Sequence, residues 1–211
     1  MTETRWTTLP SAVATECPKW ASDATKALAA ESAELFATTR AARAEAGRLR
    51  AATGTVDLMT TDPADLVDAG STARQAMIEA LRDELVARAK FGEYLAALES
   101  DRRRAQTESA AMVDQARSDA KQRLLDAGFP DLSEAVTARG GGTVPDHEAR
   151  AAFDQVVNAC PEVGKAADTY SAARSMTAVL MERSSHNARN RAEAEKALRG
   201  LLERMAAVAV G

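Results

Sequence analysis

The feature that most constrains this chain is an uninterrupted helix-forming stretch, Ser71–Ala127. It contains no proline and one glycine, Gly92, and it is rich in Ala, Leu, Arg, Glu and Gln, all of which favour helix. Thr72 and Gln75 form a Thr-x-x-Gln capping box at its start, and Gly128 marks its end. At a rise of about 1.5 Å per residue, such a helix reaches roughly 85 Å. An ordinary compact globule does not hold a helix of that length.

Two further long helices are expected on either side of this stretch. Cys17-Pro18 and Cys160-Pro161 each place a proline at a first helical position. The three long helices are therefore expected over about 18–52, 71–127 and 161–208, and short connecting helices over about 63–69, 131–138 and 146–159. Residues 1–16 form an N-terminal arm, and glycines 140–142 form a hinge. The sequence predicts an all-α fold, an elongated antiparallel three-long-helix bundle of coiled-coil type over 17–211 with two or three short connecting helices.

Apolar side chains recur along the long helices at spacings of three, four and seven residues. This spacing is typical of a coiled-coil seam. We expect these side chains to form an interaction seam, within the bundle or between chains. Its members are Leu28, Leu35, Leu49, Met77, Leu81, Leu85, Phe91, Leu95, Leu98, Met112, Tyr170, Leu180, Leu198, Leu201 and Met205.

The composition predicts a shallow core. Hydrophobic residues make up 45% of the chain, but aromatic residues make up only 4% and much of the remainder is alanine. Each contact between alanine-rich helices buries little apolar area. Stability must therefore come from the length of the helices or from partners.

The charge balance disfavours nucleic acids and membranes as partners. The chain has 27 basic and 31 acidic residues, a net charge of −4, whereas nucleic-acid-binding domains usually carry a basic excess. Arg102, Arg103, Arg104, Arg189 and Arg191 form a weak basic patch, which we interpret as a solvated helix face. Without a basic surplus we expect no binding to a membrane surface, and we expect no transmembrane segment because no run of 18 apolar residues occurs.

The N-terminus, Met-Thr-Glu-Thr-Arg-Trp, lacks the apolar segment of a cleavable signal peptide. We expect a cytoplasmic location, or a particle that is assembled in the cytoplasm.

Cys17 and Cys160 are a possible redox or disulfide pair. Both precede a proline at the expected start of a long helix, and in an up-down-up bundle they would lie at the same end. A disulfide, two thiolates of lowered pKa and contact with haem were all considered, since the Cys-Pro dipeptide resembles the haem regulatory motif. Two reduced cysteines are the favoured interpretation, because disulfides are rare in cytoplasmic proteins.

No catalytic, cofactor-binding or metal-binding residues are predicted. A helical di-iron site needs paired Glu-x-x-His motifs, and this chain has two histidines, His147 and His186, with no partner at ligand spacing. A nucleophilic hydrolase has no support without a Gly-x-Ser-x-Gly motif. We therefore expect a protein that is not an enzyme and needs no cofactor.

Three functions remain as hypotheses. The favoured one is a structural or assembly protein that acts through coiled-coil self-association or through packing into a larger complex, as in a phage, a filament or a secretion machine. The second is a monomeric helical adaptor or chaperone-like module for a partner protein. The third is a thiol- or haem-linked sensor that uses Cys17 and Cys160.

Overall fold

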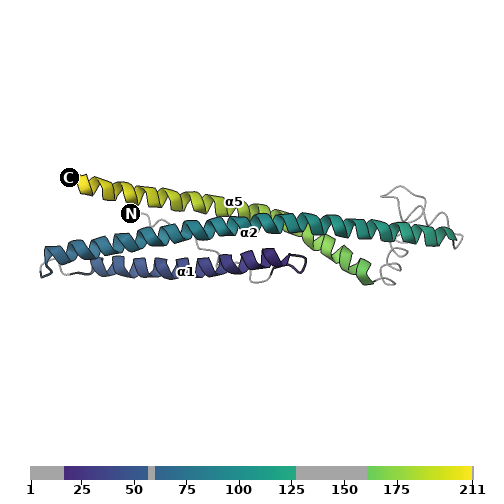
Figure 1. The fold of residues 1–211 in the computed structure, drawn as a ribbon, viewed down its shortest axis with the longest axis horizontal. Coiled ribbons are helices and arrows are strands. Elements are labelled where there is room, and N and C mark those ends of the chain that lie inside the picture. Colours follow the sequence, from purple (N-terminus) through teal and green to yellow (C-terminus); the bar gives the residue numbers. More distant parts are fainter. Residues whose placement is uncertain (1–16, 57–59, 127–160, 211) are drawn as a thin grey trace. The chain divides into compact units, whose positions relative to one another are not determined.

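The computed structural model describes residues 17–56, 60–126 and 161–210. These residues form three α-helices and no strand: α1 spans Asp23–Gly54, α2 spans Pro63–Asp126 and α5 spans Pro161–Val210 (Figure 1). The helices contain 32, 64 and 50 residues respectively. The prediction of an all-α fold is confirmed.

The first helix begins later than predicted. Ser22, not Cys17, is the N-cap of α1, and its hydroxyl accepts a hydrogen bond from the backbone N–H of Thr25 at 3.3 Å. Residues 19 and 20 form a turn before it. A serine hydroxyl can accept this bond directly, whereas the Cys-Pro dipeptide offers only the proline preference. The cap therefore falls on the better acceptor.

The second helix begins earlier than predicted. The side chain of Asp62 accepts a hydrogen bond from the N–H of Ala64 at 2.8 Å, and α2 continues from Pro63 through Gly70 without a break. The predicted short helix over 63–69 and the long helix from 71 are thus one element. Thr72 forms no capping box, because its hydroxyl donates to the carbonyl of Asp68 at 2.9 Å. Asp62 and Pro63 provide the cap and the first helical residue instead.

The third long helix begins at Pro161, as predicted from the Cys-Pro dipeptide. The predicted N-terminal arm over 1–16, the glycine hinge at 140–142 and the short helices over 131–138 and 146–159 lie outside the described residues.

The chain divides into two compact units, one formed by residues 1–98 and 180–211 and the other by residues 99–179. In the first unit, α1 and α2 lie side by side (Figure 1). The ring of Phe36 packs edge-on against that of Phe91, with 5.6 Å between the centroids. Lys90 lies 3.5 Å from Glu31. Arg43, further along α1 than Phe36, pairs with Glu84, which precedes Phe91 in α2. Between these two contacts the residue numbers rise along α1 and fall along α2.

The buried face of α1 consists mainly of small and polar side chains. The buried positions follow alternating steps of four and three residues, the pattern of a packed helix stripe. The hydroxyls of Ser32 and Thr39 are satisfied within the helix, since they donate to the carbonyls of Leu28 and Leu35 at 2.7 and 2.8 Å. The buried residues are Thr25, Ala29, Ser32, Phe36, Thr39 and Ala46.

The same unit joins α2 to α5 through a buried amide. Asn187 donates from Nδ2 to the backbone carbonyl of Arg88 at 2.9 Å. Gly92 lies beside this amide, and a Cβ atom at Gly92 would stand 3.7 Å from Nδ2. Leu81 precedes Arg88 in α2, and it lines a cavity together with Leu201, which follows Asn187 in α5. Between these two points the residue numbers fall along α2 and rise along α5.

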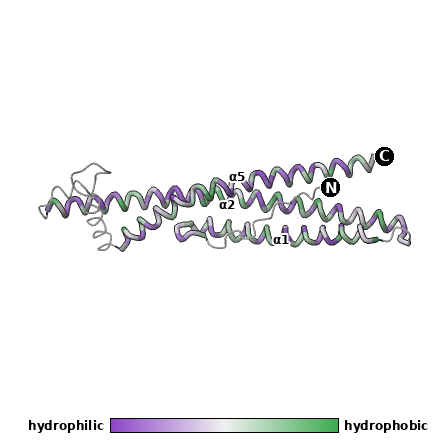
Figure 2. Tube along the Cα trace, turned by 180° about the vertical axis from the view of Figure 1, so that it is seen from behind, coloured by the Kyte–Doolittle hydropathy of each residue, from purple (hydrophilic) through white to green (hydrophobic). Residues whose placement is uncertain are grey.

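The second unit has a narrow buried face made mostly of alanine. Among the described residues of this unit, the buried apolar side chains are Ala105, Ala116, Ala120, Val163, Ala166 and Ala173. Hydrophilic and hydrophobic residues alternate along the described helices (Figure 2). Small side chains at these positions let helices approach closely while little area is buried.

Candidate functional site: a groove between α1 and α5

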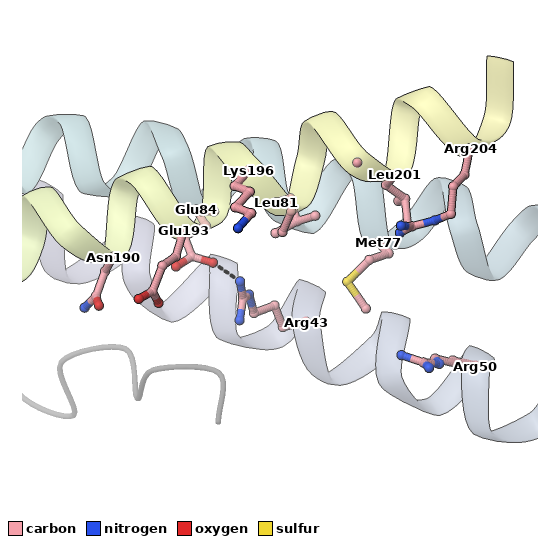
Figure 3. Close-up of a pocket in the computed structure, with 13 residues that line it drawn as sticks. Arg43, Arg50, Met77, Leu81, Glu84, Asn190, Glu193, Lys196, Leu201 and Arg204 are labelled. Carbon is pink, nitrogen blue, oxygen red and sulfur yellow. Dashed lines mark hydrogen bonds and ion pairs between the residues drawn. The ribbon is translucent and has the colours of Figure 1, made fainter. Parts of the chain in front are cut away.

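The first unit contains a groove that is lined by all three helices. It is a cavity of about 660 Å³, within the size range of binding pockets. Figure 3 shows side chains from α1, α2 and α5 directed around it. The residues that line this groove are Arg43, Arg50, Met77, Leu81, Glu84, Asn190, Glu193, Ala194, Lys196, Ala197, Gly200, Leu201 and Arg204.

Small residues of α5 leave this space open. Ala194, Ala197 and Leu201 follow one another at steps of three and four, so they share one face of the helix, and Gly200 lies beside them. From α2, Met77 and Leu81 contribute the apolar side chains. The short side chains of Ala194 and Ala197, and Gly200 with none, leave the space between the helices unfilled. Met77, Leu81 and Leu201 form the apolar floor of this space.

A buried ion network closes one side of the groove. The carboxylate of Glu84, 2% exposed, forms ion pairs with Arg43 of α1 and with Arg88 one turn further along α2. The Nε atom of Arg88 donates to Glu84 at 2.7 Å, and its guanidinium lies over the ring of Phe36, 5.9 Å from the centroid. Burial lowers the pKa of Arg43, and the Glu84 carboxylate opposes that change. The network ties α1 to α2 by charge rather than by apolar area.

The lining of the groove also includes an unpartnered amide. Asn190 is 1% exposed, and neither its Oδ1 nor its Nδ2 has a hydrogen-bond partner among the described residues. Leaving a buried polar group unpaired costs about 1–3 kcal/mol. The lining of the groove therefore holds a buried donor and a buried acceptor that no described residue satisfies.

The predicted seam residues occupy three kinds of environment. Leu81, Phe91, Leu95, Leu98 and Leu180 are buried. Met112 is 44% exposed. The other members are half-buried and flank the buried stripes, and they are Leu28, Leu35, Leu49, Met77, Leu85, Tyr170, Leu198, Leu201 and Met205. Within the seam, the groove brings together Met77, Leu81 and Leu201.

The basic patch is engaged mainly in local ion pairs. Arg102 and Arg103 both contact Glu99, and Arg104 contacts Asp101. Arg191 pairs with Glu195 one turn along α5, and Arg189 is exposed. Pairs at these spacings are ordinary helix-surface interactions, which accounts for four of the five arginines without a ligand.

Of the predicted cysteine pair, only Cys17 belongs to the described residues, and a Cys17–Cys160 bond stays a prediction. Cys17 is half-buried, and its sulfur lies 3.9 Å from the Tyr94 hydroxyl. Burial, together with the Cys17 thiol, raises the pKa of Tyr94 to about 12. In this contact the Cys17 thiol donates and the Tyr94 oxygen accepts.

Within the described segments, no three His, Cys, Asp or Glu side chains gather as metal ligands would. No helix in these segments has the length and apolar character to cross a membrane.

The groove residues that the sequence reasoning missed are polar. Arg43, Glu84 and Asn190 interrupt the apolar pattern, so a search for apolar seams passes over them. A signal for Asn190 was present, because Asn187, Asn190 and Ala194 fall at steps of three and four in register with the buried positions of α5. A polar residue at such a position is a known device for specifying helix partners.

Comparisons with protein-family models, with curated proteins and with solved structures each found no match. The function is therefore argued from the geometry of this chain alone.

Proposed function

We propose that this chain is a non-enzymatic assembly protein that forms an elongated antiparallel bundle of three long helices and joins another chain by helix packing. The contacts Phe36–Phe91 and Arg43–Glu84, whose numbers run in opposite directions on α1 and α2, support the antiparallel arrangement. The long, narrow stripes of buried alanine support association, because they bury little area within one chain. The partner that we propose is a second copy of this chain, which gives a homo-oligomer.

The groove carries this proposal. Its apolar floor includes Met77, Leu81 and Leu201, and its lining holds the buried and unpartnered amide of Asn190. Covering the floor removes apolar surface from water, which is worth about 25 cal/mol for each Å². This gain favours an occupied groove, and helices commonly bind in apolar grooves of this kind.

The carboxylate in the groove also fits a structural role. Glu84 is held between Arg43 and Arg88 and is buried. Its oxygens are engaged by guanidinium groups, so it is placed to hold two helices together rather than to take a proton from a substrate. We propose no catalytic residue on this basis.

The mass in solution tests the proposal. Light scattering after size exclusion, over a wide concentration range, is expected to give a mass above the 22.4 kDa of one chain. Leu201→Asp, which places a charge on the groove floor, is expected to return the protein to a monomer. Leu202→Asp is the matched control, because Leu202 is the next residue, is 41% exposed and does not line the groove.

A monomer at every concentration would show that self-association is wrong. The monomeric adaptor would then be the better hypothesis. An oligomer that Leu201→Asp leaves intact would instead show that assembly uses another surface.

A further inference from the structure

The open side of the groove carries an excess of positive charge. Arg50 of α1 and Lys196 and Arg204 of α5 are exposed side chains that line it (Figure 3). Glu193 is the one exposed acidic residue of the lining, and Glu84 is taken up by its ion pairs with Arg43 and Arg88. The groove therefore combines an apolar floor with a cationic rim, and it favours an occupant with acidic and apolar side chains.

The first two turns of α2 have the complementary chemistry. Asp65 and Asp68 are exposed, and they make no ion pair with any described residue. Val67 lies between them in the sequence and is 64% exposed, an unusual environment for a large aliphatic side chain. The opposite side of these turns, with Leu66 and Ala73, faces inward. The exposed side is thus a short acidic helix surface with an apolar residue in it.

Two copies cannot match by placing groove against groove. Such a contact would bring Arg50, Lys196 and Arg204 of one copy close to the same cations of the other, and juxtaposed like charges oppose association. The groove of one copy against the acidic start of α2 of the other pairs cations with carboxylates. Each copy has one groove and one acidic start of α2. In this contact, every groove can therefore bind an acidic start, and every acidic start can bind a groove.

We infer that the α1–α5 groove binds the acidic start of α2, centred on Asp65, Val67 and Asp68, from a second copy of this chain. This inference rests on the proposed function and specifies its contact. Around the helix Asp68 lies between Val67 and Asp65. Val67 is directed towards the apolar floor at Met77 and Leu201, Asp68 meets Lys196 or Arg204, and Asp65 adds negative charge at the outer edge of the contact. Because the rim charges are exposed, the association is expected to weaken as salt concentration rises.

Charge reversal tests this contact. The groove variant carries Lys196→Glu and Arg204→Glu, and the start variant carries Asp65→Lys and Asp68→Lys. Each is expected to self-associate at least about tenfold more weakly than the wild-type protein, because every contact then joins like charges. An equimolar mixture of the two variants is expected to regain the wild-type mass, since groove and start are opposite in charge between the variants. One chain with all four substitutions is also expected to regain it.

Matched controls carry the same charge changes at exposed positions outside the contact. Arg189→Glu with Arg199→Glu is the control for the groove variant on the same helix, and neither residue lines the groove. Asp83→Lys with Asp119→Lys is the control for the start variant on α2. A milder variant, Asp65→Asn with Asp68→Asn, avoids placing cations at a helix N-terminus. Circular dichroism establishes that each variant is folded.

The possible outcomes separate this inference from the proposed function. A wild-type protein that stays monomeric overturns both. An oligomer that both charge-reversed variants retain, or that the controls weaken equally, overturns the contact and leaves assembly standing. A mixture that stays monomeric, although the wild-type protein associates, also overturns the contact. Loss of association in each variant and recovery in the mixture support it.

Discussion

The side chain of Asn187 donates a hydrogen bond to the backbone carbonyl of Arg88 at 2.9 Å, and this bond joins α5 to α2. The acceptor is a main-chain oxygen, so the bond depends on the path of α2 and not on the side chain of Arg88. It lies next to the ion network of Glu84 and Arg88. In the first unit, these polar contacts lie close along α2 to Phe91, which packs against Phe36. Because hydrogen bonds and ion pairs are directional, the polar contacts define the register of the helices.

Gly92 tests how tightly α2 and α5 approach at this bond. A Cβ atom there would lie 3.7 Å from Nδ2 of Asn187, an ordinary van der Waals distance. Glycine inside a helix costs about 0.8–1.0 kcal/mol relative to alanine. Gly92→Ala is therefore expected to raise the free energy of unfolding by about 0.5–1 kcal/mol, measured by urea denaturation. Gly92→Leu, which would overlap the amide, is expected to lower it. Destabilisation by the alanine would mean that the helices lie closer than described.

Glu84 is expected to be the most sensitive charged residue of the first unit. Glu84→Gln leaves the buried guanidinium of Arg88, 1% exposed, without its carboxylate partner. Breaking one side of a buried ion pair costs about 3–5 kcal/mol, and urea denaturation measures the loss. Glu79→Gln is the control on the same helix, since Glu79 is exposed, and a surface change of this kind stays within about 0.5 kcal/mol. A loss below about 1 kcal/mol for Glu84→Gln would contradict a buried network.

The start of α5 was predictable, because proline favours the first position of a helix and Pro161 begins α5. The break at Gly70 was wrong because one glycine costs a long helix only about 1 kcal/mol. The start at Cys17 was wrong because Ser22 offers a better acceptor for the first free N–H groups.

The seam was predictable in part, and the groove was not. The leucine column of α1 is half-buried, and the buried centre of this helix consists largely of Thr25, Ser32 and Thr39. A hydropathy pattern does not mark such residues as buried, because their hydroxyls find partners inside the helix only once it has formed. The groove depends on the distance between α1 and α5, and no spacing within one helix encodes that distance.

Asn190 and Asn187 are expected to have opposite effects on stability when each is replaced by leucine. Replacing the unpartnered buried amide by an apolar side chain removes its desolvation cost, so Asn190→Leu is expected to stabilise the dilute chain by about 1–3 kcal/mol. Asn187→Leu, in contrast, removes the hydrogen bond to Arg88 and is expected to destabilise it. Thermal unfolding at low protein concentration measures both. Equal effects of the same sign would show that Asn190 has a partner in solution.

Glu99 is expected to make the protein sensitive to acid. Its hydrogen bond with Arg102 is the main cause that lowers its pKa from 4.5 to about 2, with a further contribution from Arg103, while partial burial opposes this shift. Because the folded-state pKa lies below the unfolded value, the stabilisation is fully present above about pH 4.5 and is lost as the pH falls towards 2. The urea midpoint should therefore decrease across this range.

Glu99→Gln is expected to lower stability at neutral pH and to flatten the decrease in the urea midpoint between pH 4.5 and 2. Glu108→Gln is the control, because Glu108 is an exposed carboxylate of the same helix that has no ion pair among the described residues. It should leave the acid dependence as in the wild-type protein. If Glu99→Gln kept the full wild-type slope, the carboxylate would not be held by Arg102 in solution, and the arginines at 102 and 103 would be available to an external anion.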